Sequence, residues 1–244
     1  MPTNSMLPTF ARPTLAGGLA FALWAVASSP ACAQQEDEQI WLQTNLKVPL
    51  DDDSRITLEQ ITRLSDRQDG VYTTEFGALF GQKVSKNLEL GFGYRHVSFY
   101  NGNSGKDEDR LRQQIVGTFG RFSTRLRVDE RFHPDGSEVG FRVRPLVRYN
   151  LPLNDRKLAL FVSHESFILP NSTRWGQKSG YERMRNWVGL VLPISPRASA
   201  DVAYLNQYRF ARHGARAQMD HALSLQLTVS LGTPHTKIDH THPD

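Results

Sequence analysis

The segment 220–231 alternates apolar and polar side chains without interruption. Its apolar face would carry Leu223, Leu225, Leu227, Val229 and Leu231, and its other face Ala222, Ser224, Gln226, Thr228 and Ser230. Successive side chains of a β-strand point to opposite faces, so this period of two predicts a strand with one face in an apolar medium. The same alternation recurs in roughly ten other segments, which constrains the chain to an all-β fold.

The alternation predicts eleven strands along the chain. They are expected near residues 40–48, 55–64, 72–80, 88–95, 110–119, 122–132, 141–149, 158–162, 181–192, 200–208 and 220–231. In the third strand, Tyr72 and Phe76 are expected on the outer face and Glu75 on the inner face. Bacterial membrane barrels usually have an even number of strands, so an odd number indicates that one strand is overlooked. We therefore expect about ten to twelve strands and favour twelve.

Residues 1–33 have the pattern of a cleaved export signal. Arg12 and an apolar stretch over 15–27 are followed by Ala31-Cys32-Ala33, which suits cleavage after position 33. A lipoprotein signal acylated at Cys32 is the alternative, although the leucine expected before it is absent. The apolar stretch is too short to serve as a membrane anchor.

A closed barrel surrounded by lipid accounts best for such strands behind an export signal. The mean hydropathy of −0.46 argues against a helical membrane protein, whereas only alternate residues of a membrane barrel meet lipid. A soluble lipocalin-like barrel or β-sandwich also alternates, but it buries its apolar face inside. Five tyrosines near predicted strand ends suit an interfacial belt: Tyr94, Tyr100, Tyr149, Tyr204 and Tyr208. We predict an antiparallel transmembrane β-barrel of the bacterial outer membrane over 34–231, followed by a polar tail over 232–244.

Such a barrel would contact outer-membrane lipid and would depend on periplasmic chaperones and the barrel-assembly machinery. A formal net charge of +4 is too small to indicate a nucleic-acid partner. The tail contains His235, His240 and His242, but nothing there would hold metal ligands together, so we interpret it as a solvated tail. We interpret the sequon at Asn171-Ser172-Thr173 as part of a loop. No cofactor and no metal are expected.

Several short motifs together resemble one protein family. They are Ile40-Trp41-Leu42, Gly91-Phe92-Gly93-Tyr94-Arg95, Arg110-Leu111-Arg112, Arg125-Leu126-Arg127, Glu165-Ser166-Phe167 and Asn186-Trp187-Val188-Gly189-Leu190. With the export signal, they make the mature chain similar to an uncharacterised bacterial outer-membrane β-barrel family, domain of unknown function twenty-four-ninety. The resemblance covers nearly the whole mature chain and implies an outer-membrane barrel without an assigned activity.

The inner faces of the predicted strands are rich in arginine. The candidate lumen residues are Arg95, Arg110, Arg112, Arg125, Arg127, Asp129, Arg142, Arg144, Glu165, Arg183 and Arg185. Guanidinium groups stay charged and grip oxyanions with two donors, so this face could bind anions. Alternatively, arginine–carboxylate pairs could plug a narrow barrel, which is the interpretation we favour. A hairpin at 133–136 would set Asp129 opposite Arg142 and Arg127 opposite Arg144.

Two His-x-Ser pairs are predicted on outer faces near strand ends, His96 with Ser98 and His164 with Ser166. They resemble the pairs of outer-membrane phospholipases and lipid A deacylases, in which histidine is the base for serine. The asparagine expected after the serine is absent, since Phe99 follows Ser98. The sequence therefore favours a structural or narrow anion-preferring pore protein without enzymatic activity. The alternative is an outer-leaflet lipid hydrolase that uses His96 and Ser98.

Overall fold

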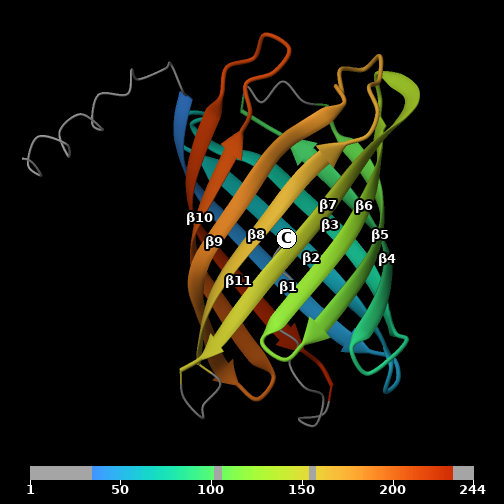
Figure 1. Cartoon of the computed structure of the whole chain (residues 1–244), viewed down its shortest axis with the longest axis vertical. Coiled ribbons are helices and arrows are strands. Elements are labelled where there is room, and N and C mark those ends of the chain that lie inside the picture. Colours follow the sequence, from blue (N-terminus) through green and yellow to red (C-terminus); the bar gives the residue numbers. More distant parts are fainter. Residues whose placement is uncertain (1–34, 102–105, 154–157, 233–244) are drawn as a thin grey trace, which may run out of the picture. The chain divides into compact units, whose positions relative to one another are not determined.

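The computed structural model describes residues 35–101, 106–153 and 158–232. The predicted signal peptide over 1–33 and residues 233–244 of the predicted tail lie outside the described residues. The described part forms eleven strands that close into a barrel (Figure 1). The strands are β1 (Gln35–Pro49), β2 (Ser54–Ser65), β3 (Gly70–Lys83), β4 (Leu88–Phe99), β5 (Glu108–Phe119), β6 (Phe122–His133), β7 (Gly136–Pro152), β8 (Ala159–Leu169), β9 (Gly180–Ser195), β10 (Ala198–Arg209) and β11 (Gln218–Ser230).

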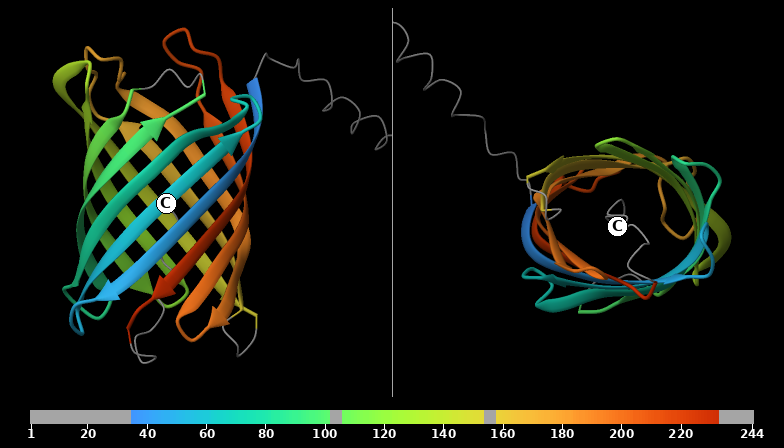
Figure 2. Two further views of the ribbon diagram at one scale, coloured as in Figure 1. Left: turned by 180° about the vertical axis from the view of Figure 1, so that it is seen from behind. Right: turned by 90° about the horizontal axis from the view of Figure 1, so that it is seen from below.

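Each strand pairs in antiparallel fashion with the next one along the chain, and β1 closes the ring by pairing with β11 (Figure 2). The closing pair is parallel, with Gln35 opposite Gln218 and Lys47 opposite Ser230. With an odd number of alternating strands, the first and last run in the same direction and can pair only in parallel. The all-β barrel is confirmed, whereas two details of the prediction are wrong. The described residues form eleven strands, not the favoured twelve, and the pairing is mixed, not wholly antiparallel.

The two ends of the barrel differ in their connections. At one end, called the turn end, the connections are 50–53, 84–87, 120–121, 153–158 and 196–197. At the other, called the loop end, they are 66–69, 100–107, 134–135, 170–179 and 210–217. Turn chemistry explains the tight connections: Gly120 adopts a φ of 63°, and the Asp51 carboxylate accepts backbone hydrogen bonds from Asp53 and Ser54. Hydrogen bonds from Ser54 and Asp53 lower the pKa of Asp51.

Most side chains on the outside of the barrel are apolar, and most charged side chains of the strands lie inside, as the alternation predicted. Phe76 and Leu223 are 60% and 47% exposed, whereas Arg127 and Glu165 are 0% exposed. Tyr72 is the exception, because it was expected outside and lies buried inside. The register between β2 and β3 shifts there, so that Tyr72 is an extra residue that turns inward. Among the described residues, no helix has the length and hydropathy needed to cross a membrane.

An apolar cluster fills the inner side of the wall formed by β8, β9, β10, β11 and β1. Its members are Trp41, Ala159, Phe161, Trp187, Val191, Ala203, Leu205 and Ala222. These side chains pack the interior on that side of the barrel. Buried charged side chains from strands around the ring fill the rest of the interior and include those that could bind a ligand.

Candidate functional site

A network of ion pairs around Glu165 lies in the interior of the barrel. Glu165 on β8 accepts hydrogen bonds from Arg125 at 2.7 Å and from Arg144 at 3.0 and 3.1 Å, and its carboxylate lies 3.8 Å from Arg185. Arg127 lies opposite Arg144 in the register of β6 and β7, as the turn at 133–136 predicted. Glu165 supplies the acid that balances Arg144, and Arg127 donates instead to the Gln114 side-chain oxygen at 2.8 and 2.9 Å.

The second predicted pair is an ion pair. Arg142 donates to the Asp129 carboxylate at 2.6 and 2.9 Å across β6 and β7. Arg95 donates to Glu59 at 2.7 Å and to Glu75 at 2.8 Å, and Arg112 also binds Glu59. Each of these carboxylates therefore binds more than one arginine, with Asp129 contacting Arg144 as well as Arg142. As a result, the network contains more cations than anions.

Solvent barely reaches the candidate residues that the sequence identified in the lumen. Arg95, Arg110, Arg112, Arg125, Arg127, Asp129, Arg142, Arg144, Glu165 and Arg185 are between 0% and 8% exposed. Phe161, toward the turn end of β8, is 2% exposed, and Leu205 on β10 is 0% exposed. A water-filled channel would leave the side chains along its path accessible. The described side chains therefore occlude the barrel in this layer.

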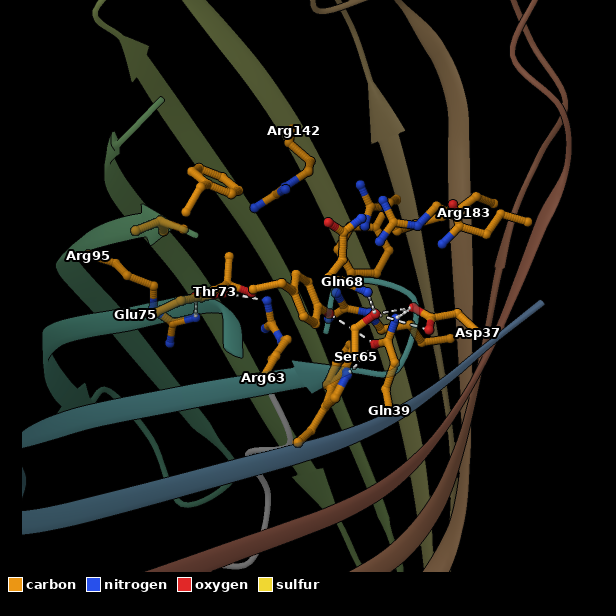
Figure 3. A pocket seen from close by; sticks show the side chains of 18 of the residues that line it. Asp37, Gln39, Arg63, Ser65, Gln68, Thr73, Glu75, Arg95, Arg142 and Arg183 are labelled. Carbon is orange, nitrogen blue, oxygen red and sulfur yellow. Dashed lines mark hydrogen bonds and ion pairs between the residues drawn. The ribbon is translucent and has the colours of Figure 1, made fainter. Parts of the chain in front are cut away.

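A cavity of about 250 Å³ extends toward the loop end, and several arginines of this layer also line it (Figure 3). Gln68 in the connection between β2 and β3 and Phe99, Arg209 and Gln218 at strand ends line its mouth. Its lining contains ten arginines and two carboxylates, Asp37 and Glu75. The arginines are Arg63, Arg67, Arg95, Arg110, Arg131, Arg142, Arg144, Arg183, Arg185 and Arg209. Such a cavity favours an anionic occupant.

Two aromatic rings hold several of these arginines in place. The Trp41 ring lies between Arg63 and Arg185, whose guanidinium carbons are 4.3 and 4.6 Å from its centroid. Phe167 contacts Arg144 and Arg185 in the same way, at 4.7 and 4.5 Å. Cation–π contacts of this kind orient a guanidinium without consuming its N–H donors.

Arg63 and Arg183 are among the cavity residues that have a side-chain donor without a hydrogen-bond partner. Among the described residues, the Nε groups of Arg63 and Arg183 are buried and have no hydrogen-bond acceptor. Their side chains are 12% and 14% exposed, so the remaining guanidinium surface reaches the cavity. Arg63 extends from β2 and Arg183 from β9, on different sides of the cavity (Figure 3). An anion between them would meet the exposed part of both side chains, which carry positive charge.

The predicted pair of His96 and Ser98 lies on the outer face of β4 near the loop end. The Ser98 hydroxyl donates to the Asp107 carboxylate at 3.1 Å. His96 Nδ1 lies 2.8 Å from Asp109, whose carboxylate also accepts a hydrogen bond from Tyr94. Both members of the pair thus contact carboxylates, and Ser98 is not directed at the histidine.

The second pair has a different geometry. His164 Nε2 lies 3.0 Å from Ser166 Oγ, and His164 Nδ1 lies 2.8 Å from the Asn186 side-chain oxygen. The Tyr181 hydroxyl lies 2.8 Å from Ser166 Oγ. The sequence did not indicate Asn186 or Tyr181, although Asn186 shares the outward parity of Val188 and could have been found on that basis.

Strand alternation also places Arg63 and Arg131 on the inner face, although the sequence analysis did not name them as candidate lumen residues. They share the inner face with Glu59 and Asp129, respectively, and Arg131 binds Glu108 at 2.6 Å. Among the described residues, no group of three or more His, Cys, Asp or Glu side chains could hold a metal ion.

Comparison with known proteins finds one family. Residues 38–220 match the family described as protein of unknown function (DUF2490). An uncharacterized protein of Methylorubrum extorquens is 32% identical over 203 residues, which cover 80% of this chain and 88% of that protein. A solved structure described as "Unveiling the Mechanism Behind the in-meso Crystallization of Membrane Proteins" has 14% identity and a TM-score of 0.39. It covers 72% of this chain and 84% of its own, and at that score it carries no argument. The family match and the relative show that this chain belongs to the DUF2490 family, as its short motifs indicated.

Proposed function

We propose that the protein is an occluded barrel of the bacterial outer membrane that binds a small polyanion in the arginine-lined cavity at its loop end. The ligand would carry phosphate or carboxylate groups, which match the planar, two-donor face of a guanidinium. The excess of arginine over carboxylate in the lining of this cavity, ten residues against two, carries the proposal. In this proposal the ligand enters from the loop end and does not cross the barrel.

The membrane location is supported by the outer surface. Exposed apolar side chains cover it on strands around the ring, including Leu58, Phe92, Leu126, Val162 and Leu227. A closed barrel is one of the two structures that satisfy every backbone hydrogen bond in lipid. Short turns at one end and longer loops at the other suit a periplasmic turn end and an external loop end. A protein of this kind would require the export signal, periplasmic chaperones and the barrel-assembly machinery.

The packed layer below the cavity argues against the pore that the sequence suggested as one possibility. Conduction requires a continuous hydrated path, whereas Arg127 and Glu165 in this layer are 0% exposed. We therefore expect purified protein in a planar bilayer to show no steady conductance, and an anion-selective current would contradict the occluded barrel.

Replacing Arg63 by glutamine should weaken binding of a polyanion, because the variant loses a cation from the lining of the cavity. We expect about a tenfold or larger rise in Kd, since a hydrogen bond to a charged group contributes roughly 1.5 to 3 kcal/mol. Isothermal titration of the folded protein in detergent with pyrophosphate, citrate and inorganic phosphate would measure it.

Arg55→Gln is the matched control, because Arg55 lies at the other end of β2 and pairs with Glu89 outside the cavity lining. It should bind the same anions as the unchanged protein. Equal affinities for Arg63→Gln and Arg55→Gln, or failure of all three anions to bind, would refute the proposed site.

A further inference from the structure

Three side chains on the outer face of β8 and β9 form a hydrogen-bonded cluster. Ser166, His164 and Asn186 are linked by contacts of 3.0 and 2.8 Å, and His164 and Asn186 are direct cross-strand partners. None of the three belongs to the arginine-lined cavity or to the inner ion-pair network. This cluster is therefore independent of the proposed anion site.

The contacts among Ser166, His164 and Asn186 determine which atom donates the proton in each hydrogen bond. The Asn186 Oδ1 atom only accepts, so the 2.8 Å contact requires His164 Nδ1 to carry the proton. His164 Nε2 is then a free base, and it accepts the Ser166 hydroxyl at 3.0 Å. A serine hydroxyl bound to a histidine base, with the histidine oriented by a third group, is the arrangement that activates serine as a nucleophile.

A β-bulge completes the cluster. The register between β8 and β9 shifts so that Phe167 faces Arg183 but Ile168 faces Tyr181, which leaves Glu182 as the extra residue. Tyr181 would otherwise share the inner face with Arg183, and the bulge turns it outward. Its hydroxyl lies 2.8 Å from Ser166 Oγ. A phenol at that distance can donate to the oxygen that gains charge when Ser166 attacks a carbonyl.

The cluster lies within an apolar outer surface near the loop end. Val162 and Val188, which are 48% and 46% exposed, lie toward the turn end, and Ile168, at 38%, lies toward the loop end. Tyr181 also packs against Phe210 with ring centroids 4.9 Å apart. Tyrosines and their aromatic neighbours gather at the level where lipid headgroups meet acyl chains, and acyl esters lie at this depth.

Cationic groups lie just beyond the cluster at the loop end. Arg212 in the connection between β10 and β11 donates to the carbonyl oxygens of Lys178 and Ser179 in the connection between β8 and β9. Lys178 and Arg216 are exposed in these two connections. An anionic lipid headgroup above the nucleophile would meet these cations, while its acyl chains would lie against the apolar wall.

We propose that Ser166, His164 and Asn186 form a serine esterase site that hydrolyses an acyl ester of a membrane lipid. Ser166 Oγ attacks the ester carbonyl and forms the acyl–oxygen bond while His164 Nε2 takes the hydroxyl proton. The ester C–O bond breaks, and the leaving alcohol receives that proton from His164. Water then attacks the acyl-serine, His164 takes its proton and returns it to Ser166 Oγ, and the fatty acid leaves. Tyr181 stabilises the oxyanion in both steps, and Asn186 positions His164.

Fatty-acid release from mixed micelles of detergent with either phosphatidylglycerol or lipid A tests this proposal and distinguishes the two ester sources. We expect release from one of the two lipids, and a loss of about 10³-fold or more in Ser166→Ala and His164→Gln. Asn186→Leu should lose most activity, whereas Asn186→Asp keeps an acceptor and should restore it. Tyr181→Phe should lower kcat with little change in KM, because the phenol acts on the transition state.

Ser98→Ala is the matched control, because Ser98 belongs to the other outward His-x-Ser pair but donates to Asp107. It should release fatty acid at the unchanged rate. A fluorophosphonate probe, which does not depend on the choice of lipid, should label Ser166 and should fail to label it in His164→Gln. Heat-modifiable mobility on a gel shows that each variant is folded. Folded protein that releases no fatty acid from either lipid and takes no label at Ser166, or release that persists in Ser166→Ala, would overturn the proposal.

Discussion

Replacing Glu165 by glutamine should lower the free energy of unfolding of the barrel by about 3 to 5 kcal/mol, because breaking a buried ion pair leaves uncompensated charge. Glu165 is 0% exposed and is the shared acid of Arg125, Arg144 and Arg185. Glutamine keeps the shape of the side chain but removes the charge that balances these cations. Urea titration of the protein in detergent, with folded and unfolded forms separated by gel mobility, would measure the change.

Glu130→Gln provides the matched control. Glu130 lies on the outer face of β6, opposite Phe141 on β7, and accepts a hydrogen bond from Gln113 at 3.1 Å. The same chemical change at this half-buried site on the outer face, where no arginine pairs with the carboxylate among the described contacts, should alter stability by less than about 1 kcal/mol. Equal stabilities of the two variants would show that the buried network does not hold the barrel together. A Glu165→Gln barrel that stays folded but conducts anions would instead show that the network acts as a plug.

Replacing Leu225 by arginine should impair assembly of the barrel, at a cost of about 2 to 4 kcal/mol if the residue faces the middle of a bilayer. Leu225 lies on the outer face of β11 between the exposed Leu223 and Leu227. Outer-membrane fractionation of cells, together with heat-modifiable gel mobility, would measure the amount of folded barrel.

Gln226→Arg is the control for this substitution, because Gln226 is the adjacent residue and faces the interior. It lies opposite Asp201 on β10, so an arginine there meets an acid and not lipid. The variant should assemble at nearly the level of the unchanged protein. If Leu225→Arg and Gln226→Arg reach the membrane equally well, the outer face of β11 does not contact lipid and the membrane location is wrong.

Alternation was sufficient to predict which residues of most strands face inward. The predicted lumen residues Arg95, Arg127 and Glu165, for example, are buried in the structure. Period-two patterns are local, and a face that contacts one medium over a whole strand leaves little ambiguity. Tyr72 is the exception, because a β-bulge changes the parity and depends on pairing with the neighbouring strand.

Only part of the candidate sites could be predicted from the sequence. The turn at 133–136 placed Asp129 opposite Arg142 correctly, because hairpin register follows from the turn. The contact of Glu165 with Arg125 spans two strands that do not pair, so no local pattern could have indicated it. The two His-x-Ser pairs are equivalent in sequence, and only the partners on neighbouring strands distinguish Ser166 from Ser98.

The sequence by itself determined that this chain forms β-strands, that the strands bury charge on one face and expose apolar groups on the other, and that arginine dominates the buried face. These properties follow from side-chain alternation, which each strand carries within its own residues. Tertiary structure alone decided the parallel closure of β1 on β11, the sharing of Glu165 among three arginines and the contact of Asn186 with His164. Each of these depends on strand number, register or bulges, which arise only when distant segments pair and close the barrel.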